Sequence, residues 1–519
     1  MFKTLANAWK IKDLRDKLIF TIMVVLVYRI GAAVTVPFVD ASQISSYVSS
    51  TLGGMATLLS TLSSGFEQAS LFALGVSPYI TASIVIQLLT VAIPSLERLA
   101  KQGEEGKKKI TVITRYITMG IALITAIGYY FMIQSLITVN NDYYATTFDK
   151  WLAAIVIIAC FCAGSALVMW LAERINEKGI GNGISIILFA NIVSRGVSVV
   201  TGYYSKIVAI IYGNPYGWSA SDIESVKSSH NSYHNQIWKD GKLTSVGEFY
   251  DEYHLLDVNS YKLPFEEAYP YVDTGAGWSY RIPAILILIL ITIGILALIW
   301  FVVHISDSER RIPVQYAKKV VGRKMYGGRN TNLPLKVNMA GVMPVIFASA
   351  ILSLPAMIIG FCQPEEGGFW YGVYEFLSPN TWFYALLTFI MLLAFAYFYV
   401  SISFNPFEVA NNLQQNGGSV PGIRPGKPTA LYIKKVLSRV TFIGALCLAV
   451  VAVVPVVVYV ILNAVGGWTD LPGLMGSNTM IMDFVNSGTS IIIVVGVVLE
   501  VVRELESQMT MRHYKGFLD

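Results

Sequence analysis

Side chains that could carry out catalysis do not form a familiar pattern in this sequence. Motifs of the form G-x-x-x-x-G-K-[ST], H-E-x-x-H, C-x-x-C and G-x-S-x-G are absent, so a nucleotide-driven enzyme, a zinc hydrolase or a serine hydrolase is unsupported. The glycine-rich segment 179–183 joins two apolar blocks, and we do not expect it to bind phosphate. The sequence predicts no catalytic residue, no metal site and no cofactor.

Charged side chains within the apolar blocks are scarce, and Arg29 is the clear example. It lies near the middle of the first block, so its guanidinium cannot easily reach the membrane surface. We favour a structural hydrogen-bonding role inside a helical bundle over a functional site. Glu173 and His304 lie at block ends and Glu500 lies near one, whereas an ion-coupled transporter normally buries acids along its path.

The surrounding chain has the composition of a membrane protein. Of its 519 residues, 54% are hydrophobic and 14% are charged, whereas a typical soluble domain is about 25% charged. A bilayer core about 30 Å thick needs about 20 apolar residues of helix, because helices satisfy their own backbone groups in lipid. The sequence therefore predicts an all-α bundle of ten transmembrane helices, at residues 18–37, 73–93, 112–133, 151–172, 184–204, 282–304, 338–360, 382–404, 440–463 and 488–502.

Lysine and arginine are distributed unevenly between the loops. The N-terminal segment, the tail and alternate connections are basic, including the large loops 305–337 and 405–439. Segments 38–72, 361–381 and 464–487 contain no lysine or arginine. Because cytoplasmic loops of membrane proteins carry the excess of positive charge, we expect both termini in the cytoplasm.

Two segments interrupt this pattern. Residues 54–68 are apolar at helical spacing but too short to span, so they form either an external surface helix or a half-helix folded back into a cavity. Residues 212–281, rich in Tyr, Asp and Glu, predict an ordered extracytoplasmic insertion. A cut there leaves five spans on each side in opposite orientations, as in an inverted repeat. The predicted domains are 1–211 with spans 1–5, the insertion 212–281, and 282–519 with spans 6–10.

Five motifs follow one another on this topology. They are Arg29-Ile30-Gly31, Leu74-Gly75-Val76-Ser77-Pro78-Tyr79, Glu177-Lys178-Gly179-Ile180-Gly181-Asn182-Gly183, Leu333-Pro334-Leu335-Lys336-Val337-Asn338 and Val420-Pro421-Gly422-Ile423-Arg424-Pro425-Gly426. Together they resemble the SecY (Sec61α) family over nearly the whole chain, except 212–281 and the final few residues. The resemblance implies an hourglass channel made of two five-helix halves that open like a clamshell.

The resemblance also implies a ring of branched aliphatic side chains at the waist of the channel. Apolar residues at a constriction exclude water from the idle pore, and flexible aliphatic chains can close around a moving polypeptide. Without the resemblance, the same residues would be ordinary membrane-core residues. The ring candidates are Val76 and Ile80 on the second span, Ile184 and Leu188 on the fifth, Ile346 on the seventh and Ile493 on the tenth.

Three further groups of site residues follow from the same resemblance. Segment 54–68 resembles the family's plug, a half-helix below the ring, here with Gly54, Leu58, Leu62, Gly65 and Phe66. The side exit to lipid, or lateral gate, lies between the second and seventh spans, with candidate polar contacts at Gln87 and Asn338. The resemblance places Arg323, Lys324 and Arg424 on cytoplasmic loops that dock the ribosome or a motor. The same positive charges are also explained by their effect on the orientation of the chain in the membrane.

The function implied by the resemblance is that of the central pore subunit of the Sec protein translocase in the bacterial cytoplasmic membrane. Such a subunit conducts unfolded secretory polypeptides across the membrane and releases transmembrane segments laterally into it. The expected partners are SecE and SecG-type small membrane subunits, the SecA motor ATPase, the ribosome, secretory preproteins, nascent membrane proteins, membrane lipids and a periplasmic partner at 212–281. The alternative is a secondary transporter of a small solute, which would need buried coupling acids.

Overall fold

The structure is a computed structural model, and its described residues are mostly helical. They form two compact units, one of Met1–Arg195, Leu298–Val460 and Met482–Asp519, and the other of Gly196–Ala297 and Ile461–Ile481. The described residues are 2–40, 43–45, 47–48, 59–60, 63, 65–100, 102–137, 146–211, 238–239, 242–243, 278–316, 319–321, 324–326, 330–362, 368–379, 381–464 and 478–515.

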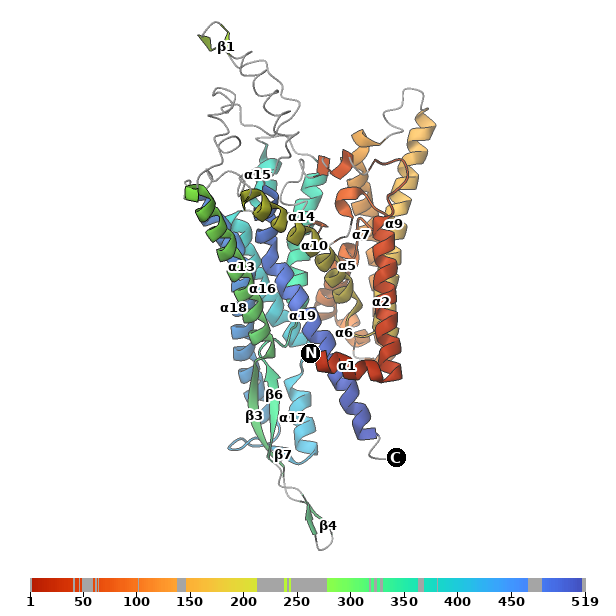
Figure 1. Cartoon of the computed structure of the whole chain (residues 1–519). Helices are drawn as coiled ribbons and strands as arrows, with labels where there is room; N and C mark the ends of the chain where they lie inside the picture. Colours follow the sequence, from red (N-terminus) through yellow and green to blue (C-terminus); the bar gives the residue numbers. More distant parts are fainter. Residues whose placement is uncertain are drawn as a thin grey trace. The chain divides into compact units, whose positions relative to one another are not determined.

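A helix covers most of each predicted span (Figure 1). These helices are α2 (Lys12–Ala33), α5 (Ser77–Ala92), α7 (Glu104–Ile133), α9 (Thr147–Lys178), α10 (Gly183–Ile211), α13 (Trp278–Asp307), α14 (Met343–Phe361), α16 (Trp382–Ser403), α18 (Lys427–Ala464) and α19 (Asn478–Lys515). Shorter helices are α1 (Phe2–Lys10), η1 (Phe66–Gln68), α6 (Pro94–Ala100), η2 (Gln134–Leu136), α15 (Phe369–Phe376) and α17 (Pro406–Gln415).

Five stretches of helix in the described residues are long and apolar enough to cross a membrane, and they contain α7, α9, α14, α16 and α18. Helices α5 and α6 pass the same test only as a pair bent by 106°. The bend lies at Ile93, which is extended because the following Pro94 disfavours helical backbone at the preceding residue. The chain is therefore a multi-pass membrane protein, and the count of ten spans stays a prediction.

Several helices start away from the predicted spans, and α14 and α18 show the two reasons. Helix α14 begins at Met343 rather than 338, because Gly341 has φ +63° and Pro344 suits the first turn of a helix. Helix α18 begins at Lys427 rather than 440, since an apolar run marks only the part of a helix that lies in lipid. Asn338, which was expected on the seventh span, consequently lies in the turn before α14.

The all-α prediction missed a small sheet. Strands β3 (Glu309–Tyr316), β6 (Asn330–Lys336) and β7 (Gly418–Ser419) form an antiparallel sheet in the order β6-β3-β7. Alternate residues Ile312 and Val314 of β3 are buried, the period expected of a half-buried strand. Two hairpins accompany it: β4 (Lys319–Val321) with β5 (Lys324–Tyr326), and in the second unit β1 (Trp238–Lys239) with β2 (Lys242–Leu243). The rest of the insertion between 212 and 277 lies outside the described residues.

Contacts within the first unit bring several basic segments to one end of it. Lys17 donates a 3.1 Å hydrogen bond to Gln508, and Arg503 lies 2.7 Å from the carboxylate of Asp307. The start of α2, the end of α13 and the last turns of α19 therefore meet. Figure 1 shows α17 and the sheet at this same end.

Candidate functional site

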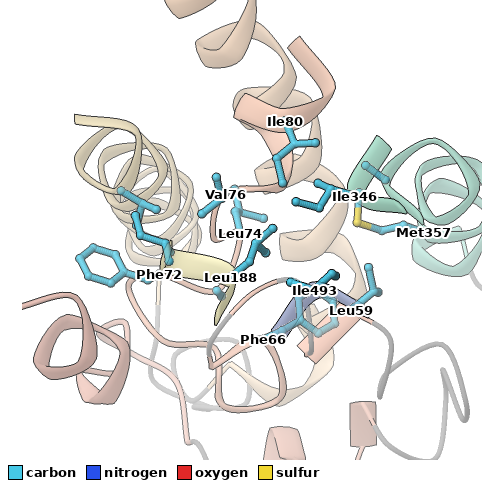
Figure 2. Close-up of a cluster of buried hydrophobic side chains, with 14 of the residues drawn as sticks. Leu59, Phe66, Phe72, Leu74, Val76, Ile80, Leu188, Ile346, Met357 and Ile493 are labelled. Carbon is cyan, nitrogen blue, oxygen red and sulfur yellow. The ribbon is translucent and has the colours of Figure 1, made fainter. Parts of the chain in front are cut away.

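The six ring candidates are buried in one hydrophobic cluster. Val76, Ile80, Leu188, Ile346 and Ile493 are each at most 4% exposed, and Ile184 is half-buried against the same cluster. They come from four segments far apart in the sequence: the start of α5, the start of α10, α14 and α19. Figure 2 shows five of them close together, beside Leu59 and Phe66.

Tight glycine turns place most of these residues in the first turns of their helices. Gly75, with φ +53°, precedes α5, and Pro78 occupies its first turn. Asn182 accepts a 3.0 Å hydrogen bond from the Ile184 amide and so caps the start of α10. A Cβ at Gly183 would lie 2.0 Å from the Ala172 carbonyl oxygen, so only glycine allows this approach to α9. The motif glycines thus fix where α5 and α10 begin, and with them the positions of the ring candidates on these helices.

The described part of the plug candidate belongs to the same cluster, through Leu59 and Phe66. Leu59, Ser63 and Phe66 are at most 3% exposed, and only about 20 Å³ of space, enough for roughly one water, separates them from α5, α7 and α14. Gly65 has φ +79°, a conformation that favours glycine. The predicted plug residues Gly54, Leu58 and Leu62 lie outside the described residues.

Tyr129 of α7 fixes the C-terminal end of this segment. Its hydroxyl donates a 2.6 Å hydrogen bond to the Phe66 carbonyl oxygen. Its ring contacts Phe66 at 4.9 Å and Phe161 of α9 at 5.1 Å between centroids. Since the hydroxyl and the ring are both fully buried, this end is held by hydrogen bonding and by aromatic packing.

Two arginines have partners at neighbouring positions, one on the same segment and one on α10. Arg195 of α10 lies 3.5 Å from the Glu67 carboxylate in η1, and Arg29 of α2 donates to the Ser194 hydroxyl. The structural role expected for Arg29 thus has a partner on α10. Arg195 was missed, although it lies within the predicted span 184–204.

Arg115 was also missed, although it lies within the predicted span 112–133. Its guanidinium binds both carboxylate oxygens of Glu173 on α9, at 2.9 and 2.7 Å. Glu173 is 9% exposed, whereas the Arg115 side chain is 46% exposed. A count of every charge inside the predicted spans would have found both arginines.

The lateral-gate candidates do not touch in the described part of the chain. Gln87 donates a 3.2 Å hydrogen bond to Ser83 on its own helix, and Asn338 is half-buried in the turn before α14. Helices α5 and α14 nonetheless pack against each other. The seam between them is therefore closed by apolar packing rather than by this polar pair.

The docking candidates lie on the loops around the small sheet. Arg424 is exposed in the turn between β7 and α18, and its carbonyl accepts a 2.8 Å hydrogen bond from the Thr429 hydroxyl. Lys324 begins β5, and Arg323 lies outside the described residues. Burial lowers the pKa of Lys336 in the adjacent β6, and the nearby positive charge of Arg503 lowers it further.

Comparison with known proteins identifies the family. The SecY family model matches residues 70–502. This chain belongs to the SecY family. Among its relatives is the protein translocase subunit SecY of Streptomyces coelicolor, 36% identical over 100% of both chains, and that of Aquifex aeolicus, 32% identical over the same shares. A solved structure described as a protein conducting channel matches 94% of this chain and 92% of its own, at 16% identity and a TM-score of 0.49.

Among the described residues of this SecY-family chain, no group of three or more His, Cys, Asp or Glu side chains is placed to hold a metal ion. Its four cysteines are unpaired, and only Cys362 is exposed.

Tyr129→Phe is expected to destabilise the folded protein by about 1 kcal/mol, because it removes a buried hydrogen bond and leaves the Phe66 carbonyl only the longer bond, of 3.4 Å, from the Ala69 amide. The loss is measured as a lower melting temperature of the detergent-purified protein. Tyr130→Phe removes a hydroxyl one position along α7 and is the matched control. Equal melting temperatures for the two variants would show that the Phe66 hydrogen bond contributes nothing.

Proposed function

We propose that this SecY-family chain is the pore subunit of a protein translocase, with Val76, Ile80, Ile184, Leu188, Ile346 and Ile493 as its constriction ring. The observation that carries the proposal is that five of these residues are buried in one cluster and Ile184 packs against it, although they come from four separate segments. A ring of this kind excludes water when idle and yields to a polypeptide, because aliphatic side chains change rotamer at little cost.

The segment 54–68 acts as the plug of the idle pore. The contacts of Tyr129 with Phe66 support a fixed C-terminal end, so that release swings the N-terminal part of the segment away. The Arg195–Glu67 pair supports the closed position only weakly. Both side chains are more than a quarter exposed, and such pairs contribute about 0–1 kcal/mol. A translocating chain can therefore displace the plug without a large energy input.

The lateral gate lies between α5 and α14. Their apolar seam, with Gln87 bonded within its own helix, supports a gate that an apolar segment can part by replacing one set of apolar contacts with another. A hydrogen bond across the membrane helices would have resisted opening by about 0.6–2 kcal/mol.

The basic end of the first unit is the proposed cytoplasmic docking surface, with both termini on that side. Exposed Arg424 and the hairpin of β4 and β5, which contains Lys324, support binding of a large partner such as the ribosome or the SecA motor. That partner supplies the energy for transport. SecE and SecG-type subunits, the two five-helix halves and a periplasmic partner at 212–281 belong to the same proposal.

Crosslinking of a stalled secretory chain tests the ring. Single cysteines at Ile80, Ile184 and Ile346, in a variant that lacks the four native cysteines, are expected to crosslink to a cysteine in the stalled segment. The matched controls face outward on the same three helices and are Val91, Val193 and Ile358, which are 60%, 43% and 44% exposed. Crosslinks at the controls alone would refute the pore, and export of a small solute without any crosslink would favour the transporter.

A further inference from the structure

A groove unrelated to the pore lies between the end of α7 and the start of α9. Its volume is about 750 Å³, within the range of about 300–1,000 Å³ typical of ligand sites. Its walls are formed by residues on both helices and on η2: Ile127, Tyr130, Phe131, Met132, Gln134, Ser135, Thr147, Lys150, Trp151, Ala154 and Ile158.

The lining changes from polar to apolar along the groove. Gln134, Ser135, Thr147 and Lys150 lie where the two antiparallel helices end and begin. Ile158 lies eleven residues along α9 from Thr147, or about 16 Å at 1.5 Å per residue. The groove is therefore amphipathic along its length, with hydrogen-bonding groups and one cation at one end only.

The side chains around the groove face the surrounding lipid. Ile124 and Phe131 on α7 are 65% and 61% exposed, and Trp151 and Ile155 on α9 are 68% and 64% exposed. Both helices are long and apolar enough to cross a membrane. A large aromatic ring next to polar residues at a helix end is typical of the membrane–water interface. The polar end of the groove consequently lies at the depth of the lipid headgroups.

We propose that this groove binds one phospholipid of the leaflet into which it opens. The phosphate lies against the ammonium group of Lys150, the only base in segment 134–150. One acyl chain runs along Ile127, Ala154 and Ile158, where the small Ala154 leaves room for it. The neighbouring Asp149 carboxylate accepts hydrogen bonds from the Thr146 amide at 2.9 Å and from the Thr146 hydroxyl at 2.6 Å, both at Oδ2.

A photoreactive lipid tests this site in the full-length protein. The probe is phosphatidylglycerol with a diazirine on one acyl chain, mixed into phosphatidylcholine vesicles that hold the purified protein. We expect the peptides at the end of α7 and the start of α9 to be labelled several-fold more than the exposed Phe442 and Ile443 region of α18. Ala154→Trp fills the groove and should remove this excess, whereas Ile155→Trp, one position away and facing lipid, should leave it intact.

Lys150→Gln separates the headgroup contact from the chain contact, and it keeps the groove open. It is expected to lower the labelling of the α7 and α9 peptides several-fold with the anionic probe. Uniform labelling of all lipid-facing helices would show annular lipid only and would overturn the proposal. So would equal labelling of the two tryptophan variants, or labelling that Lys150→Gln leaves unchanged. The result is independent of the pore assignment, because the groove needs only that the chain lies in a membrane.

Discussion

Gly164→Ala is expected to prevent α9 from packing against the segment that leads into the proposed pore ring. A Cβ at position 164 would lie 1.8 Å from the Leu71 carbonyl oxygen and 2.9 Å from its carbonyl carbon. Backbone atoms cannot rotate away as a flexible side chain would, so the helix or the segment must move. Overpacking of a core costs about 1–3 kcal/mol and occasionally more, and a backbone clash belongs at the upper end of that range.

The expected results are a large fall in melting temperature and in the amount of folded protein in the membrane. Because Leu71 lies only five residues before Val76, the fraction that still folds should also leak ions if the proposed ring seals the pore. Gly120→Ala on α7 is the matched control, since its Cβ would meet nothing within 4 Å. In a helix, alanine is more favourable than glycine by about 1 kcal/mol, so this control should be neutral or stabilising. Similar losses for both variants would contradict the close approach of Gly164.

Arg115→Gln is expected to destabilise the protein more than Glu173→Gln, although both remove the same ion pair. The first variant removes the arginine partner of the buried Glu173 carboxylate. Such a loss costs about 3–5 kcal/mol in a fully buried pair. Here we expect about 2 kcal/mol, because Arg115 is half-exposed. The second leaves a guanidinium that water can reach, so its effect should be smaller.

The asymmetry is measured by thermal denaturation of the two single variants and of the double variant Arg115→Gln/Glu173→Gln. The double variant should recover part of the stability lost in Arg115→Gln, because no buried charge remains. Arg174→Gln breaks the exposed Arg174–Glu177 pair next to Glu173 on the same helix and should change stability by less than about 1 kcal/mol. Equal losses in the two single variants would mean that Glu173 is solvated in the folded protein.

Apolar run length predicted the helices well wherever the run ends at a helix-stopping residue. Helix α16 was expected over 382–404 and covers Trp382–Ser403, since Thr381 caps its start and Asn405-Pro406 follows its end. Where polar residues continue a helix beyond the lipid, as at the start of α18, hydropathy gave the wrong boundary. The sheet of β3 and β6 was missed because only two alternate residues of β3, Ile312 and Val314, are buried, and so short an alternation is not a clear strand pattern.

The site residues depended on motifs rather than on periodicity. Hydropathy does not distinguish Ile80, which the structure buries, from Val91 on the same helix, which is 60% exposed, because both lipid and protein are apolar surroundings. The contact of Tyr129 with Phe66 joins segments 63 residues apart, and no local pattern records it. Glu67 and Arg195 were likewise unpredictable as a pair, although each charge is visible in the sequence.

The wide separation of the proposed ring residues also sets the order in which they are synthesised. Ile346 and Ile493 are 147 residues apart, as 493 minus 346, and ribosomes add roughly 5–20 residues each second. About 7–30 s therefore pass between the synthesis of the fifth aliphatic residue and that of the last. A chain whose translation stops in this interval lacks one of the six side chains of the proposed ring.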